Sequence, residues 1–473
     1  MSIVKNIQKY HFKWIILIGI ITGQLSCEDA LEPDFPKELY INQYEVFDTA
    51  NNAEAAARGM YQQMLTPGHP FYTSLDGGIS TLAGMSADEL LYLLDNNADL
   101  TQFNTNMLLA ENGKVEDIWK GFYQSIFTAN GLLVNLSNTD INPELVTKLR
   151  GEALFVRAIS YFHLVNFFGD IPLVLNNNYL ENANIARSPA SKVYAQIESD
   201  LLESIVALPD TYEAERTRPI KATAKAFLAR VYLYQENWQE AIDLATEIIN
   251  DTSTYELVDL NNIVQVGNRE ALWQLHISKP LANNPVTNEG TAFISSTALF
   301  FRYSQLQESL VTIFEPGDLR KDRWVYEYLP DVYLPYKYKR GNVTDPGPLE
   351  YTTVMRLAEV YLIRAEAYAR TEQNMEALMD LDALRGRAGL SLLAETQPEL
   401  SGEVLLQQIL QERQAELFTE WGHRWLDLKR TGKALEVLSP IKPGIDENDL
   451  LWPIPQLEIN NNPALRGHQN PGY

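Results

Sequence analysis

The stretch that decides the fold is Leu149-Arg-Gly-Glu-Ala-Leu-Phe-Val-Arg-Ala-Ile-Ser-Tyr-Phe-His-Leu-Val-Asn-Phe-Phe-Gly-Asp-Ile-Pro-Leu-Val174. Its residues with helical spacing predict one buried face; they are Leu149, Ala153, Val156, Ser160/Tyr161, Leu164 and Phe167/Phe168. The helix should end at Gly169, where a positive φ costs little, with Pro172 just beyond. A buried helix needs helical partners, so we expect an α-helical scaffold.

Two later segments repeat a spacing that is typical of the tetratricopeptide hairpin. Ala229-x2-Tyr232 is followed by Ala241, and Ala365-x2-Tyr368 is followed by Ala377. The small residues allow two antiparallel helices to approach closely. Ala158-x2-Tyr161 starts a third unit, whose second helix is delayed to Val193–Leu208. We therefore predict a mainly α fold, in which tetratricopeptide-like hairpins form a scaffold with insertions.

Apolar periodicity and capping signals place the remaining elements along the chain. The expected helices are Asp48–Leu65 with a cap at Asn51 or Asn52, a short Asp88–Leu94, Val115–Leu136, 147–168, Pro189–Leu208 opened by Ser188, Thr223–Glu236, Trp238–Asn250, Tyr351–Thr371, Asn374–Ala388 and Ser401–Thr431. Residues 251–350 lose this periodicity and are rich in aromatics, Pro, Gly and Asn, with one alternating strand at Ala271–Ile277. We therefore predict that residues 251–350 form a large, irregular, loop-rich insertion.

The N-terminus has the pattern of a secretory signal. Three lysines precede the apolar run Trp14–Ile21, and Leu25-Ser26-Cys27 follows. This order predicts a bacterial lipoprotein signal in which Cys27 becomes the lipidated terminus; an ordinary signal peptide with an incidental Cys is the alternative. Acyl chains would anchor the protein stably. No later stretch reads as transmembrane, so the lipid would be the membrane attachment.

These observations predict the organisation of the chain. Residues 1–26 are the lipoprotein signal peptide, and residues 27–47, acidic and Pro-bearing, are the lipidated tether. Residues 48–473 form a single α-helical domain. Within it we distinguish an N-terminal helical part (48–250), the loop-rich, ligand-side insertion (251–350), and a C-terminal helical part with a tail (351–473).

Charge and composition exclude several classes of function. The net charge is −24, which disfavours nucleic acid and anionic lipid surfaces as partners. The single Cys and six scattered His give no zinc site, and there is no Gly-x-Gly-x-x-Gly, P-loop or Gly-x-Ser-x-Gly motif. Asp95–Asp99 lacks the Gly and distant Glu of a calcium loop. We expect no metal, no cofactor and no catalytic residue, although a pair of glycosidase carboxylates is defined in space and not by sequence.

The remaining signal is aromatic residues in non-periodic segments. Aromatic faces stack on the apolar faces of sugars, and neighbouring polar groups add hydrogen bonds. The candidate ligand-binding residues are Tyr72, Tyr92, Phe103, Phe301, Tyr303, Trp324, Tyr326 and Tyr333, with Phe300 and Tyr336 beside them. The alternative is that these rings form the small cores of loop subdomains.

Several stretches together resemble the SusD/RagB family of outer-membrane nutrient-binding lipoproteins. They are Asp117-x-Trp119-x3-Tyr123-x2-Ile126-x2-Ala129-Asn130, Phe168-Gly-Asp-Ile-Pro-Leu173, Arg356–Leu362 with Ala365-Glu-Ala367, Leu384–Gly389, Arg413-x2-Glu416-Leu-Phe418-x-Glu420-x3-Arg424-x2-Asp427-Leu428-x-Arg430, and the tail from Pro453-Ile-Pro455 to Gln469–Tyr473. Independently of the resemblance, the spacing of Trp119, Tyr123 and Ile126 predicts one buried helix face. The spacing of Arg413, Glu416, Arg424 and Asp427 predicts ion pairs that brace the helix or its junctions. The motifs therefore identify a scaffold and no ligand.

The resemblance implies a lipid-anchored protein that faces the cell exterior, caps a SusC-like TonB-dependent transporter and hands it an oligosaccharide or peptide. In the family, variable loops build the ligand site, so no site residue transfers by motif. Our first hypothesis is a non-catalytic glycan-binding lipoprotein. A peptide-binding member of the family, a surface glycoside hydrolase and a pure interaction scaffold are the alternatives.

Overall fold

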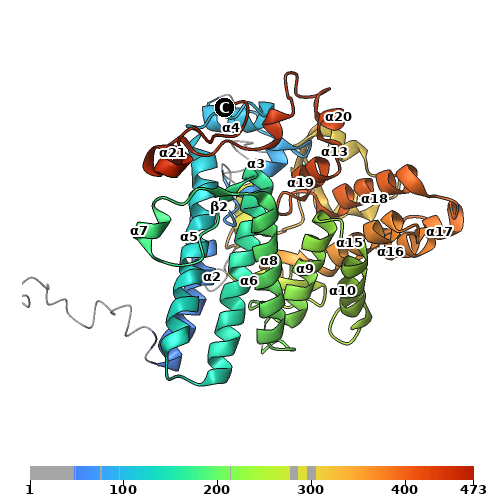
Figure 1. Ribbon diagram of the computed structural model, residues 1–473. Helices are drawn as coiled ribbons and strands as arrows, with labels where there is room; N and C mark the ends of the chain where they lie inside the picture. Colours follow the sequence, from blue (N-terminus) through green and yellow to red (C-terminus); the bar gives the residue numbers. More distant parts are fainter. Residues whose placement is uncertain are drawn as a thin grey trace, which may run out of the picture. The chain divides into compact units, whose positions relative to one another are not determined.

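The computed structural model describes residues 47, 49–74, 77–94, 96–213, 215–276, 286–295 and 305–473. The part of the chain from Phe47 onward forms one compact, mainly helical unit (Figure 1). Its helices are α2 (Ala50–Met64), α3 (Ile79–Ser86), α4 (Ala98–Thr105), α5 (Gly113–Asn135), α6 (Pro143–Phe168), α7 (Tyr179–Asn182), α8 (Ala190–Ala207), α9 (Lys221–Tyr234), α10 (Trp238–Asn250), α11 (Asn288–Ile294), α13 (Glu308–Thr312), α14 (Leu319–Trp324), α15 (Leu357–Arg370), α16 (Asn374–Arg387), α17 (Leu393–Thr396), α18 (Gly402–Leu417), α19 (His423–Arg430), α20 (Ala434–Leu438) and α21 (Gln456–Asn461). None of these described helices has the length and apolar character needed to cross a membrane.

The described strands form antiparallel pairs. The pairs are β1 (Leu90–Leu91) with β5 (Gln305–Leu306), β2 (Ile171–Pro172) with β3 (Arg187–Ser188), β4 (Ala271–Leu275) with β8 (Thr352–Arg356), and β6 (Val325–Leu329) with β7 (Val332–Pro335). The β4–β8 pair is buried along its length and joins the insertion to the start of the C-terminal helical part, while β6–β7 is a hairpin at the surface of the insertion.

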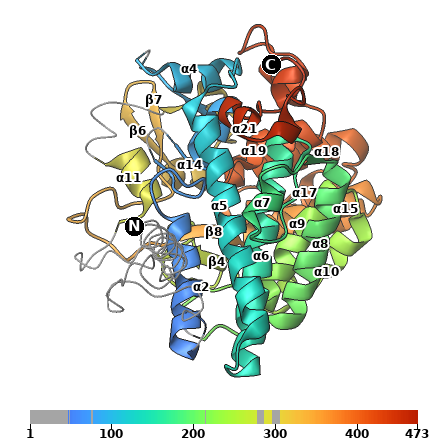
Figure 2. The ribbon, with the colours of Figure 1, turned by 60° about the vertical axis from the view of Figure 1, so that its left-hand side comes forward.

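Helix α6 is the central element, as the quoted stretch predicts. Asn142 caps its start, Pro143 occupies the first turn, and it ends at Gly169, whose φ is +72°. The expectation of a single buried face is wrong, because buried residues run around the whole circumference from Leu149 to Phe168. The cause is that α5 and α8 lie along α6 on two sides, with α2 and α9 also in contact (Figures 1 and 2).

The predicted helical hairpins are present as α9–α10 and α15–α16, and these four helices lie side by side (Figure 1). The small residues at the repeated positions are all fully buried, which allows the close approach; they are Ala229, Ala241, Ala365 and Ala377. The third pair is α6–α8. There Arg157 donates from Nε and Nη2 to both carboxylate oxygens of Asp200, each at 2.7 Å. The mainly α scaffold with tetratricopeptide-like hairpins is confirmed.

Three predicted elements are wrong in kind or extent. Residues 352–356 form strand β8 instead of the start of a helix, because Thr352, Thr353 and Met355 pair with β4. The expected helix 401–431 is divided into α18 and α19 by a turn in which Thr419 and Trp421 have positive φ. Residues 88–94 contain β1 and not a helix.

Two predicted caps are also displaced. Thr49, and not Asn51 or Asn52, caps α2 by accepting a hydrogen bond from the Asn52 amide. Helix α8 begins after Pro189 without a cap from Ser188, which is in β3.

Buried ion pairs join the insertion to the C-terminal helices. The Arg356 Nη1 atom lies 2.9 Å from a Glu270 oxygen, and its Nη2 atom donates to the Glu416 carbonyl at 2.6 Å. Arg320 of α14 also reaches the Glu416 carboxylate at 3.3 Å. Burial alone would raise the pKa of Glu416, but the arginines around it hold that pKa well below its usual range. The charged motif in this region therefore braces the scaffold, as its spacing predicts.

Candidate functional site

Three of the predicted ligand-binding aromatics are core residues. Tyr92, Phe103 and Trp324 are buried. The Trp324 indole donates to the Leu260 carbonyl at 2.8 Å, and Phe103 packs edge-on against Trp452. Their rings therefore fill the interior, as in the alternative interpretation of the sequence, and in this conformation they offer no face to a ligand.

The other predicted residues have different positions. Tyr72 is half-buried in the loop before α3. Phe301, Tyr303 and the lipidation candidate Cys27 lie outside the described residues. Tyr326 and Tyr333 are on the β6–β7 hairpin, but on opposite faces, because Tyr326 pairs with Leu334 and Tyr333 with Glu327.

One face of this hairpin carries an exposed group of tyrosines, which we call the tyrosine face: Tyr326, Tyr328 and Tyr336. The Tyr326 ring centroid lies 5.4 Å from that of Tyr336 and 6.4 Å from that of Tyr328. Tyr326 is 41% exposed, and its two neighbours are half-buried. The Tyr326 ring is thus the most exposed of the three and is tilted by 36° and 49° to the rings of Tyr336 and Tyr328. Exposed aromatic rings of this kind stack on sugar rings.

A lysine supports the tyrosine face from one side. The Lys339 ammonium lies 4.1 Å from the Tyr336 ring centroid, a cation–π contact. Burial lowers the pKa of Lys339 to about 8. On the opposite face of the hairpin, the charge of Glu327 raises the pKa of Tyr333. Within the tyrosine face, the Tyr336 ring thus has a charged neighbour on one side.

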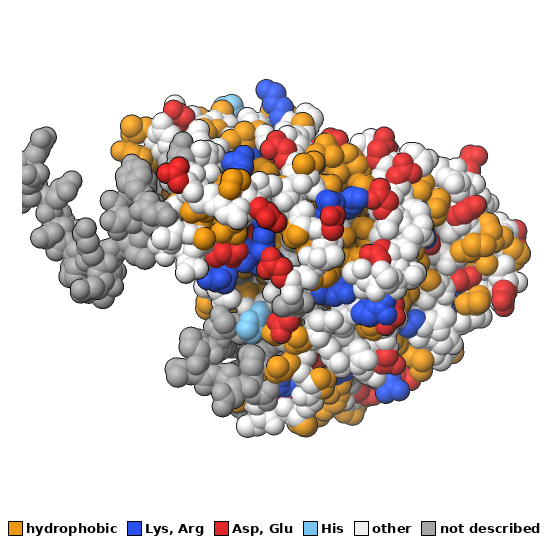
Figure 3. Space-filling model, turned by 90° about the horizontal axis from the view of Figure 1, so that it is seen from below, with side chains coloured by type: hydrophobic (Ala, Val, Ile, Leu, Met, Phe, Trp, Pro, Cys, Tyr) orange, Lys and Arg blue, Asp and Glu red, His pale blue; other side chains and the backbone are white. Residues whose placement is uncertain are grey.

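A second candidate surface is a polar cleft between α2, the start of α6 and the loop 209–220. It consists of three adjoining hollows of about 280, 590 and 550 Å³. The first shares Lys148 and Glu213 with the second, and Thr217 and Arg218 with the third. Seen from below, the molecule carries interspersed acidic and basic side chains (Figure 3). Hollows of this size accommodate sugar residues.

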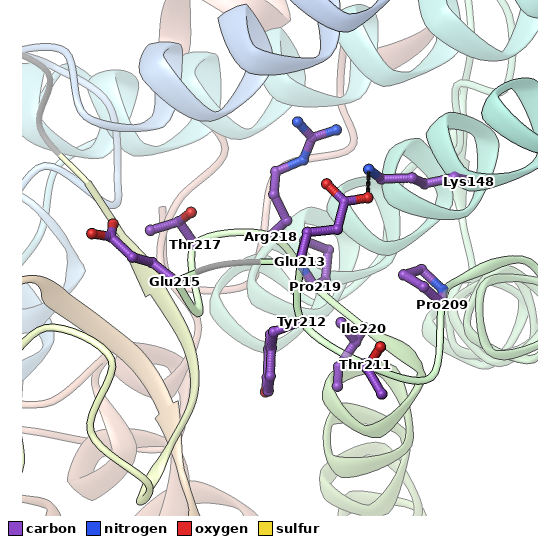
Figure 4. Close-up of a pocket in the computed structure, with 10 residues that line it drawn as sticks. All are labelled: Lys148, Pro209, Thr211, Tyr212, Glu213, Glu215, Thr217, Arg218, Pro219 and Ile220. Carbon is purple, nitrogen blue, oxygen red and sulfur yellow. Dashed lines mark hydrogen bonds and ion pairs between the residues drawn. The ribbon is translucent and has the colours of Figure 1, made fainter. Parts of the chain in front are cut away.

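Ion pairs occupy most charged groups of the cleft. Lys148 and Glu213 point at each other and form an ion pair, while the Tyr212 ring is directed away from them (Figure 4). Arg218 lies 3.1 Å from Glu54 and 2.6 Å from Glu152. Because Glu54 and Glu213 already have cationic partners, they are poorly placed as a free catalytic pair.

A buried tyrosine lies behind these ion pairs. The Tyr61 hydroxyl donates to Glu152 at 2.8 Å, and burial together with the Glu152 charge raises the Tyr61 pKa. Within the described ranges, no group of three or more His, Cys, Asp or Glu side chains could hold a metal ion.

The candidates named from the sequence include Tyr336 beside the main list, but they omit Tyr328 and the cleft residues. The Tyr326-x-Tyr328 spacing was the available signal, since residues two apart share the face of a regular strand, although the register of β6 shifts between Glu327 and Leu329. The cleft had no sequence signal, because its charged groups come from elements far apart in the chain.

Comparisons with known proteins match this architecture. A family model described as "Starch-binding associating with outer membrane" matches residues 79–233, and the SusD family model matches residues 317–473. The SusD-like protein P2 of Formosa agariphila is 28% identical, over 98% of this chain and 100% of that protein. A SusD-like protein of Bacteroides ovatus is 24% identical, over 69% of this chain and 67% of its own length.

Solved structures agree with these matches. A laminarin-binding SusD-like protein superposes with a TM-score of 0.75 and 26% identity, covering 90% of this chain and 100% of the other. A SusD homolog from Bacteroides thetaiotaomicron has a TM-score of 0.77 at 20% identity, covering 93% and 100%, and so shares the fold.

Proposed function

The chain belongs to the SusD/RagB family, and from this premise we propose that it is a non-catalytic glycan-binding protein of the cell surface. It would be anchored through a lipid on Cys27 to the outer membrane, face the exterior, and deliver an oligosaccharide to a SusC-like TonB-dependent transporter. The observation that carries the proposal is the tyrosine face, an exposed aromatic surface on a scaffold that a laminarin-binding relative shares.

Mechanistically, sugar rings would stack on Tyr326 and Tyr328, the two residues of the tyrosine face that lie on β6. Stacking depends on ring shape and spacing, so it would select linkage and chain length more than monomer identity. Binding without chemistry requires no cofactor and no metal. Weak, multi-ring contact also suits a protein that must release its ligand to a transporter.

The test is affinity electrophoresis of the purified protein against a panel of polysaccharides, with product analysis of the same mixtures. We expect retardation by at least one glycan without hydrolysis, and about tenfold weaker binding for Tyr326→Ala/Tyr328→Ala, the loss of two stacking contacts. Tyr179→Ala on α7 is the matched control, since Tyr179 is 74% exposed and distant in sequence from the hairpin.

Each other outcome selects an alternative. Released sugars would establish a surface glycoside hydrolase, and binding of peptides alone would establish a peptide-binding member of the family. If the protein binds no glycan and no peptide, the remaining hypothesis is a pure interaction scaffold. Cys27→Ser should abolish labelling by radioactive palmitate and release the protein from membranes; unchanged labelling would contradict the proposed anchor.

A further inference from the structure

The third hollow of the cleft, of about 550 Å³, lies between α2 and the end of β4. Its wall on α2 is formed by Ala55, Arg58, Gly59 and Gln62, which share one helix face at i, i+3, i+4 and i+7. Gln62 donates from its side chain to the His276 carbonyl at 3.1 Å and so fixes α2 against the strand end. We call this space the cationic hollow.

Its lining carries two arginines in a strongly acidic protein. Arg58 and Arg218 line it beside His276, and none of its lining residues is an Asp or Glu, although the chain carries a net charge of −24. Arg218 is held by Glu54 and Glu152 at the rear. Among the described residues, no hydrogen bond to a ring nitrogen of His276 is formed, and its ring lies 4.6 Å from that of Tyr351.

Arg58 is the group best placed to contact a ligand. Its side chain is 61% exposed, and the nearest acid, Glu54, is 3.8 Å away, too far for a hydrogen bond. A guanidinium presents paired N–H donors that match a carboxylate or sulfate. Arg58 therefore retains donors that the scaffold does not use.

Gly59 is a second, independent indication. A glycine inside a helix destabilises it relative to alanine. Packing does not require it here, because a Cβ at Gly59 would meet nothing within 4 Å, and the residue is exposed. Its position in the wall gives a reason: any larger side chain would project into the cationic hollow. Ala55, one turn earlier in α2, also has a small side chain and so occupies little of the hollow.

We propose that the cationic hollow binds an acidic sugar residue, with Arg58 gripping its carboxylate or sulfate and Gly59 leaving room for its ring. This inference rests on the proposed glycan-binding function and names the substrate class. The net negative charge does not prevent it, because the Debye length at physiological salt is about 8 Å. Salt therefore screens distant acids more strongly than it screens a direct contact to Arg58.

The experiment is isothermal titration of the purified protein with a uronate oligosaccharide (tetragalacturonate), a sulfated one (carrageenan tetrasaccharide), neutral laminaritetraose and tetraglutamate. We expect the acidic sugars to bind, and Arg58→Gln to weaken the binding about tenfold or more, the loss of a charged hydrogen bond. Gly59→Trp should abolish it by filling the hollow, and Gly59→Ala should weaken it by a smaller factor, because a methyl group occupies less of the space. The two acidic sugars distinguish carboxylate from sulfate recognition.

Arg466→Gln is the matched control, an exposed arginine in the C-terminal tail that should bind like the wild type. Circular dichroism verifies the fold of each variant, and Arg58→Gln remains informative if Gly59→Trp fails to fold. Acidic-sugar binding that neither variant changes, or binding of laminaritetraose alone, would overturn the inference and leave the proposed function intact. Binding of tetraglutamate alone would overturn both this inference and the proposed glycan-binding function. The same holds if none of the four probes binds and no polysaccharide of the wider panel binds either.

Discussion

Arg230 of α9 and Glu359 of α15 form a bidentate ion pair, with Nε–Oε1 and Nη2–Oε2 distances of 2.6 Å. Both side chains are buried, and they connect the first helices of the two tetratricopeptide-like hairpins across 129 residues of sequence. The pair thereby fixes how one hairpin packs on the next.

Removing either Arg230 or Glu359 should destabilise the protein, because it leaves the other charge buried without a partner. We expect Arg230→Ala to lower the free energy of unfolding by about 3–5 kcal/mol. The double variant Arg230→Met/Glu359→Leu should lose much less, because it leaves no charge behind. Urea denaturation followed by tryptophan fluorescence measures both; equal losses in the single and double variants would show that the pair acts through packing alone.

A second prediction concerns the turn that separates α18 from α19. Gly422 has a φ of +75°, and a Cβ there would lie 2.8 Å from the Ala83 Cβ. Gly432, after α19, has a φ of +69° but no atom within 4 Å of a Cβ. Gly432→Ala should therefore cost about 1–2 kcal/mol from backbone strain, and Gly422→Ala about 1–3 kcal/mol more from the clash.

Thermal or urea unfolding of the two variants separates strain from clash. If both substitutions cost the same, the contact with α3 is not tight, and the turn is shaped by backbone conformation alone.

The sequence was most informative where one local signal decides the structure. Gly169 ends α6 as expected, and the alanines at twelve-residue spacing mark the two hairpins. The sequence led to wrong predictions where contacts between distant segments determine the local structure. Residues 418–422 lack proline, yet the helix breaks there, and the Trp421 indole donates to the Thr353 carbonyl at 2.8 Å.

The candidate site was less predictable for the same reason. An aromatic residue in a loop can fill a core or face solvent, and sequence does not distinguish the two. Trp324 is buried because Lys337 and Phe418 pack against its ring, while Tyr326, two residues later, faces outward. Whether the chain is one domain with the predicted signal and tether stays a prediction.

A third test concerns Asp170, in the motif after α6. Its Oδ1 accepts a hydrogen bond from the Ala190 amide at 2.8 Å, and so caps the start of α8 from a distant loop. Asp170→Ala should cost about 1 kcal/mol of stability, as for other capping residues. Asp170→Asn, which keeps an acceptor oxygen, should retain most of it. An alanine variant as stable as the wild type would show that solvent satisfies the amide equally well.

The last prediction follows from a buried acid. Glu89 accepts a hydrogen bond from the Thr419 amide at 3.1 Å, with Asp88 beside it in sequence. Burial, more than any neighbour, raises the Glu89 pKa to about 8. The folded protein therefore holds a proton there that the unfolded chain releases above a pH of about 4.5, so the free energy of unfolding should fall between pH 5 and pH 8.

Glu89→Gln mimics the protonated carboxyl at every pH and should remove this contribution. Relative to the wild type, we expect the variant to gain about 1 kcal/mol of stability per pH unit between pH 5 and pH 8. Urea unfolding at pH 5, 6.5 and 8 measures the difference, and Glu395→Gln at an exposed position should give a flat profile. A constant difference between Glu89→Gln and the wild type would mean that Glu89 is ionised throughout, and that the cations near α19 stabilise its charge despite burial.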